Sequence, residues 1–126
     1  KILWKVPMNK RELGESYEEA ASLYLQKKGV RIAERNFRCR QGEVDLIGWD
    51  GEYLVFFEVK YRKNKNAGYP EESVGTGKQK KICGVADYYL YQRRLGESIP
   101  VRFDVVAICG ESVNWYQNAF DYIRPY

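Results

Sequence analysis

The segment most informative about the fold is Gly42-Glu-Val-Asp-Leu-Ile-Gly-Trp-Asp-Gly-Glu-Tyr-Leu-Val-Phe-Phe-Glu-Val-Lys60. Two segments rich in β-branched and aromatic residues, 43–49 and 52–60, flank the dipeptide Asp50-Gly51. Such segments are typical of strands, and Asp-Gly tolerates the positive φ that a type I′ turn needs. The stretch therefore predicts an antiparallel hairpin with Asp50-Gly51 as its two-residue loop.

The register of this hairpin follows from the loop. It places Asp45 opposite Phe56 and Glu43 opposite Glu58, which makes Asp45 and Glu58 diagonal neighbours. Because residues two apart on a strand share a face, Glu43, Asp45, Glu58 and Lys60 are expected on one side of the sheet. The apolar residues expected on the other side are Val44, Leu46, Val55, Phe57 and Val59.

The acids of this hairpin suggest a site for a cation. Neighbouring carboxylates repel one another unless something positive lies between them, and Mg²⁺ prefers oxygen ligands of this kind. Lys60, on the same face as Glu58, is suited to hold a water molecule or to stabilise developing negative charge. The alternative is that each acid is a solvated edge-strand charge, neutralised by Lys60 and nearby arginines.

The rest of the chain reads as alternating helices and strands. Apolar residues at helical spacing predict helices over residues 10–28 and from 76 to about 96, and alternation predicts strands at 30–38, 101–109 and 113–116. Thr76-x-x-Gln79 resembles a capping box at the start of the second helix, and residues 61–75 read as a polar loop. The order α-β-β-β-α-β-β predicts an α/β protein in which helices flank a mixed sheet.

The first predicted helix contributes another acid. Leu13, Tyr17, Ala21 and Leu25 lie on its apolar stripe, and Glu18 lies at the boundary of that stripe. From there Glu18 is able to reach toward a site on the sheet. The alternative is a salt bridge at the helix boundary.

Composition limits the chemistry further. The 126 residues fit one domain, with residues 1–7 as a leader or an added extension before Met8 and 8–126 as the domain itself. There is no histidine, which excludes imidazole bases, His metal ligands and Ser-His or Cys-His catalysis. Three cysteines without a C-x-x-C motif argue against zinc and for a reducing, cytoplasmic location. No apolar run is long enough to span a membrane.

These residues resemble a known family. The set Asp45…Glu58-Val59-Lys60 resembles the D…(D/E)-x-K core of the PD-(D/E)xK nuclease superfamily. The chain as a whole resembles the YraN family of predicted endonucleases, which is similar to archaeal Holliday-junction resolvases. The further matching motifs are Tyr17-Glu18-Glu19-Ala20-Ala21, Arg35-Asn36-Phe37-Arg38, Gly42-Glu43-Val44-Asp45-Leu46-Ile47, Lys78-Gln79, Arg102-Phe103-Asp104-Val105-Val106 and Asn118-Ala119-Phe120.

The resemblance implies a restriction-endonuclease-like α/β core and metal-dependent hydrolysis of DNA phosphodiesters, on branched, flapped or single-stranded DNA. It implies that Asp45 and Glu58 bind Mg²⁺ or Mn²⁺, with the Val59 carbonyl as a third ligand. In the same comparison Lys60 positions the attacking water. The other candidates for the catalytic set are the helix-borne Glu18 and the Glu43 of the G-E-x-D-L-I motif. The alternative is a DNA-binding or scaffold protein that retains the nuclease fold without turnover.

The distribution of charge agrees with DNA as a partner. The net charge is only +4, but basic residues gather after the predicted catalytic strand and before the hairpin. The candidates for phosphate contacts are Arg62, Lys78, Lys81 and Arg38. Resolvase-like enzymes usually work as dimers, so the resemblance also suggests a homodimer. The alternative is that these basic residues form ordinary solvated surfaces.

Overall fold

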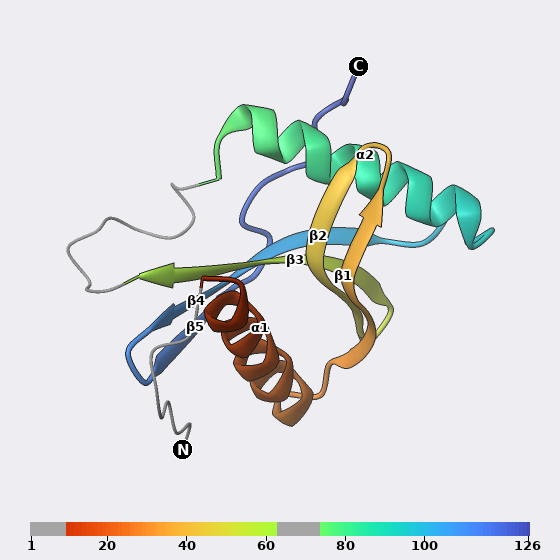
Figure 1. The fold of residues 1–126 in the computed structure, drawn as a ribbon. Coiled ribbons are helices and arrows are strands. Elements are labelled where there is room, and N and C mark those ends of the chain that lie inside the picture. The colour runs from red at the N-terminus through yellow and green to blue at the C-terminus, as the bar shows by residue number, and fades with distance from the viewer. Residues whose placement is uncertain (1–9, 63–73) are drawn as a thin grey trace.

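The computed structural model describes residues 10–62 and 74–126, and the elements follow in the order α-β-β-β-α-β-β (Figure 1). Their bounds are α1 (Lys10–Lys27), β1 (Arg31–Cys39), β2 (Gly42–Asp50), β3 (Tyr53–Arg62), α2 (Thr76–Gln92), β4 (Val101–Cys109) and β5 (Ser112–Tyr116). The predicted α/β class and element order are confirmed. The proposed leader and most of the predicted loop 61–75 lie outside the described residues.

The five strands form one mixed sheet in the order β1-β2-β3-β4-β5. Strands β3 and β4 are parallel, and the other neighbours are antiparallel. A parallel pair needs a crossover connection, and α2 lies in that connection. In Figure 1 the two helices cover opposite faces of the sheet, and β3 runs through its centre. No helix in these two ranges is long and apolar enough to cross a membrane.

Each helix buries its apolar stripe against one face of the sheet. The cluster under α2 contains Phe56 and Phe103 from the sheet and Ile82, Val85 and Tyr89 from the helix. The cluster under α1 contains Ala20, Ala21, Leu25, Leu46, Val55, Phe57, Val106 and Ile108. Alternate residues of β3 therefore serve opposite cores, and the helical stripes predicted from the sequence are confirmed where the structure describes them.

The hairpin forms, but the predicted loop is wrong. Asp50 pairs with Tyr53, so the loop is Gly51-Glu52, and Leu46 pairs with Phe57. Gly51 has φ +61 at the first loop position, where the turn needs a residue without a Cβ. The register is consequently shifted by two residues from the predicted one, and Asp50 becomes the last paired residue of β2.

The start of α2 also differs from the prediction. Gly75 is the N-cap and makes no side-chain cap hydrogen bond, so Thr76 is already inside the helix. The Gln79 side chain instead donates a 2.7 Å hydrogen bond to the carbonyl of Val74. Val74 is buried in the core under α2. Anchoring of this residue, rather than a capping box, fixes where the helix begins.

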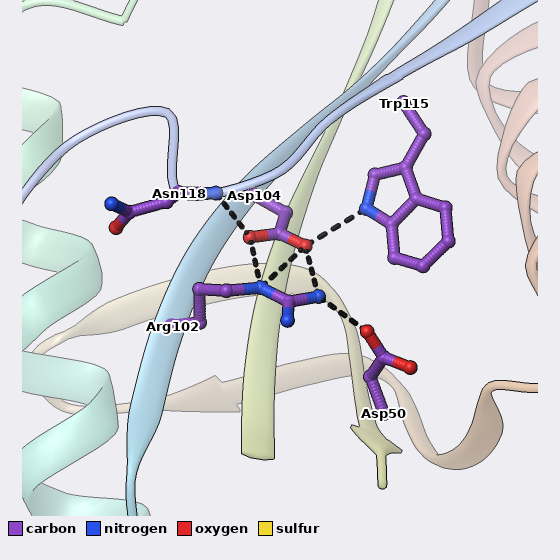
Figure 2. A network of polar contacts seen from close by, with 5 residues as sticks. All are labelled: Asp50, Arg102, Asp104, Trp115 and Asn118. Carbon is purple, nitrogen blue, oxygen red and sulfur yellow. Dashed lines mark hydrogen bonds and ion pairs between the residues drawn. The ribbon is translucent and has the colours of Figure 1, made fainter.

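A network of polar residues joins the hairpin to β4 and β5 (Figure 2). Asp104 is fully buried and accepts hydrogen bonds from the Arg102 guanidinium, from Trp115 Nε1 at 2.8 Å and from the Asn118 backbone nitrogen at 2.8 Å. Arg102 also contacts the Asp50 carboxylate at 2.8 Å. A buried acid here is fully compensated by permanent donors, which makes the network a structural one.

Candidate functional site

Strands β2 and β3 separate beyond the pair Leu46–Phe57, and the candidate site lies at this fork. The next residues of the two strands are Asp45 and Glu58. The Val59 backbone nitrogen donates a 2.7 Å hydrogen bond to Asp45 Oδ2. A carboxylate side chain thus takes the place of a backbone acceptor, which fixes Asp45 in the fork between the strands.

A local twist of β1 and β2 accompanies this arrangement. Asn36 faces Asp45 in the β1–β2 register and has φ +50, which Asn tolerates better than most residues. Val44 packs in the cluster under α2, whereas Leu46 packs in the cluster under α1. The prediction that these two residues share one face is therefore wrong. The twist changes the face that β2 presents on either side of Asp45.

Three acids from three elements meet at the fork. Asp45 comes from β2, Glu58 from β3 and Glu18 from α1, with Glu18 hydrogen-bonded to Asp45. Burial, followed by repulsion from Glu58 and the influence of Glu18, raises the pKa of Asp45 to about 8, although the Val59 N–H bond acts to lower it. Burial is the largest of these effects, so the protonated form of this carboxyl group is favoured well above the usual pH range of an aspartic acid.

Two lysines approach the other acid. Lys60 Nζ lies 3.4 Å from Glu58 Oε2, and the ammonium of Lys78, on the first turn of α2, contacts the same oxygen. The Glu58 side chain is only 5% exposed, against 47% for Lys78. Burial acts to lower the pKa of Lys78, but its hydrogen bond to Glu58 and the charges of Glu58 and Asp45 raise it above its usual value. The nearly buried Glu58 side chain is thus contacted by two ammonium groups.

The structure brings together Glu18, Asp45, Glu58, Lys60 and Lys78. It does not bring Glu43 or Arg38 to them: these two form an ion pair of 2.9 Å with each other, and both are mostly exposed. Lys81 lies beside Gln41 in a surface hollow of about 560 Å³ along α2. Arg62 lies at the end of β3, and its Nε is buried without a hydrogen-bond partner among the described residues.

The donor set at the fork suits a hard cation with an open coordination sphere. Within residues 10–62 and 74–126, no group of three or more Asp, Glu, Cys or His side chains is arranged to hold a metal ion. Two carboxylates, Asp45 and Glu58, are nevertheless the usual protein share of a Mg²⁺ site, which is completed by water and substrate phosphate. The raised pKa of Asp45 points the same way, because a dication beside it would favour the charged carboxylate.

The contact between Lys78 and Glu58 was not foreseen from the sequence. Two signals in the sequence, the family motif Lys78-Gln79 and the position of a basic residue after the predicted catalytic strand, single out Lys78 as a candidate for phosphate contacts and not as a partner of Glu58. Its position beside Glu58 depends on how the crossover returns α2 to the sheet, which local patterns do not record. The same holds for the hydrogen bond between Glu18 and Asp45, although the helical phase of Glu18 did favour the sheet side.

Fold and site together define an α/β protein with a mixed sheet and an acid-and-lysine site where two strands part. Comparison with known proteins gives the family. The model described as "Uncharacterised protein family UPF0102" matches residues 17–108, and the chain belongs to this family. The matched region contains every residue of the fork site.

Relatives in this family are similar over nearly their whole length. A UPF0102 protein of Lachnoclostridium phytofermentans is 47% identical over 114 residues, covering 90% of this chain and 97% of the relative. One from Vibrio campbellii is 46% identical, covering 88% and 93%. One from Caldicellulosiruptor saccharolyticus is 44% identical over 119 residues, covering 90% and 100%. The resemblance drawn from the motifs is therefore confirmed at the level of the family.

Proposed function

We propose that this protein is a metal-dependent endonuclease that hydrolyses DNA phosphodiester bonds, on branched, flapped or single-stranded DNA. The observation that carries the proposal is the fork itself. It gathers Asp45 and Glu58 from adjacent strands, with Lys60 beside them, and leaves Asp45 with a pKa of about 8. Neighbouring acids in a partly buried place destabilise the fold unless enough basic side chains offset them. A group of acids that lacks such side chains therefore suggests a functional role.

Each residue of the fork has a role in this proposal. Asp45 and Glu58 would hold Mg²⁺ or Mn²⁺, with the Val59 carbonyl as a third ligand. When bound, such an ion lowers the pKa of water and stabilises charge on a phosphoryl oxygen. Lys60 holds the attacking water and offsets the negative charge that develops on the phosphate. Glu18 orients Asp45 through their hydrogen bond.

Basic residues around the fork support DNA as the substrate. Lys78 on α2 contacts Glu58, and Arg62 is the last residue of β3, the strand that carries Glu58. In this proposal both residues contact phosphates that flank the cleaved bond. Lys81, farther along α2, extends this basic surface. Such contacts read the backbone rather than the sequence, which agrees with a substrate recognised by its shape. The proposed homodimer would supply two such sites for two cuts.

The test is a cleavage assay on a panel of junction, flap and single-stranded DNA with Mg²⁺ or Mn²⁺. Asp45→Ala and Lys60→Ala should each lower the rate by about 100-fold or more, the scale of removing an electrostatic or acid-base group from an active site. Glu52→Ala and Lys80→Ala are matched controls, because both residues are exposed. Equal cutting by the wild type and the two fork variants would contradict the proposal.

A second candidate is a DNA-binding or scaffold protein that retains this fold without turnover. It is favoured by one observation: the ammonium groups of Lys60 and Lys78 already neutralise Glu58 without a metal. This candidate predicts DNA binding that persists in EDTA and no cutting with any divalent cation. The endonuclease predicts cutting that EDTA abolishes.

A further inference from the structure

The two lysine ammonium groups at the fork come from different elements. Lys78 comes from α2, whereas Glu58 and Lys60 come from β3, and the Lys78 ammonium contacts the same Glu58 oxygen as Lys60. We propose that Lys78 is an exchangeable counter-ion, which holds Glu58 in the metal-free protein and leaves it for a DNA phosphate when a divalent cation binds. This inference rests on the proposed metal site and names a residue that regulates it.

Competition follows from the charges involved. A divalent cation at Asp45 and Glu58 would stand within a few ångströms of the ammonium that now contacts Glu58 Oε2. Like charges at such distances repel strongly in a partly buried site. Since linkage is reciprocal, any factor by which Lys78 weakens metal binding is also the factor by which metal weakens the Lys78–Glu58 contact.

The Lys78 side chain has more freedom to move into solvent than the Lys60 side chain. The Lys78 side chain is 47% exposed, against 22% for Lys60, so its flexible stem can swing toward solvent without opening the core. The first turn of α2 carries no acidic residue and no side-chain cap, and no atom of the described residues would lie within 4 Å of a Cβ at Gly75 or Gly77. The positive end of the helix adds to the ammonium charge, so a phosphate arriving here replaces the carboxylate as its partner.

The first experiment titrates Mn²⁺ into the DNA-free protein and follows its thermal unfolding. Lys78→Ala should tighten the apparent Kd for Mn²⁺ by about tenfold, within the usual range for coupled sites. Lys80→Ala is the matched control: it removes the same charge from an exposed position of the same helix and should leave the Kd within about twofold. Lys78→Arg, which keeps the charge, should remain close to the wild type.

The outcomes separate this inference from the proposed function. If Mn²⁺ still shifts the unfolding temperature of Asp45→Asn as it does the wild type, the metal site itself is wrong. If Asp45→Asn abolishes the shift while Lys78→Ala and Lys80→Ala bind Mn²⁺ equally, the metal site stands and the exchange of Lys78 is overturned.

The second experiment follows Lys78 onto DNA. In a Lys60→Ala background, chosen to prevent cutting, DNA affinity is measured over a range of salt concentrations with Mn²⁺ and with EDTA. Adding Lys78→Ala should reduce the slope of log affinity against log salt by about 1 in Mn²⁺, the change expected for one lost phosphate contact. It should leave the slope unchanged in EDTA, where Glu58 retains the ammonium. The same change under both conditions would contradict the exchange.

Discussion

Two groups of buried and half-buried acids lie at the same sheet and are compensated in different ways. Near the hairpin, Asp104 is surrounded by donors from Arg102, Trp115 and Asn118, all of them permanent parts of the fold (Figure 2). At the fork, Asp45 has other acids for neighbours, and their repulsion adds to burial in raising its pKa to about 8.

The difference separates a structural acid from a candidate functional one. The protein can place an arginine beside a buried carboxylate, as Arg102 beside Asp104 shows. At the fork it places Glu18 and Glu58 beside Asp45, and one of the two lysines there is half exposed. An acid that the fold leaves short of positive charge is suited to bind a cation from outside.

The largest expected effect comes from breaking the structural group. Asp104→Ala leaves the Arg102 guanidinium, 11% exposed, with Asp50 as its remaining partner in the network. Removing one member of a buried ion pair should lower the free energy of unfolding by about 3–5 kcal/mol, measured by urea denaturation. The double variant Arg102→Met with Asp104→Leu should cost less than the single one. If Asp104→Ala lowers the free energy of unfolding by less than about 1 kcal/mol, Asp104 is not the structural acid that distinguishes its group from the fork.

At the fork, removing the acid should have the opposite effect and raise the free energy of unfolding of the metal-free protein at high pH. An unfolded Asp has a pKa of about 4, so between about pH 4 and pH 8 folded Asp45 holds a proton that the unfolded chain has lost. In EDTA, Asp45 should therefore contribute a stability that falls as pH rises from about 4 to 8 and then levels off. Asp45→Asn should lack this decline and should be more stable than the wild type above pH 8.

Denaturation over a pH series checks the sign, with Glu52→Gln as the control for an exposed acid. With saturating Mg²⁺ the wild type should gain stability toward pH 8, since metal binding requires the charged carboxylate. If Asp45→Asn destabilises the metal-free protein at high pH, Asp45 belongs with Asp104 as a structural acid.

The smallest expected effect concerns Glu43, which the family motif includes and the structure keeps apart from the fork. Its ion pair with Arg38 is exposed, so Glu43→Ala should change the free energy of unfolding by less than about 0.5 kcal/mol. It should also leave the Mn²⁺ titration unchanged, unlike Asp45→Asn. A weakened Mn²⁺ response in Glu43→Ala would extend the site to the solvent face of β2.

Much of this architecture could be read from local patterns. The strands, the helical stripes and the acid-and-lysine set follow periods of 2 and 3.6 residues, which any segment displays on its own. The hairpin register could not be fixed in this way, because Asp50-Gly51 and Gly51-Glu52 are competing loops that differ by a two-residue shift. A shift of two residues keeps most side chains on the same face of the sheet, so the faces of β3 were predicted correctly. The same shift changes which residues lie opposite one another, so the position of Asp45 opposite Glu58 was not predicted.

Local sequence patterns are sufficient to predict the element order, the two apolar stripes and the candidate residues Asp45, Glu58 and Lys60, since these depend on neighbours in the chain. The packing of the folded chain is what brings Lys78 to Glu58 and Glu18 to Asp45, and what leaves Glu43 in solvent. Each of these contacts joins elements far apart in sequence or depends on the local twist of β2. Their distances are set by how helices pack on both faces of a twisted sheet, and no local periodicity encodes that packing.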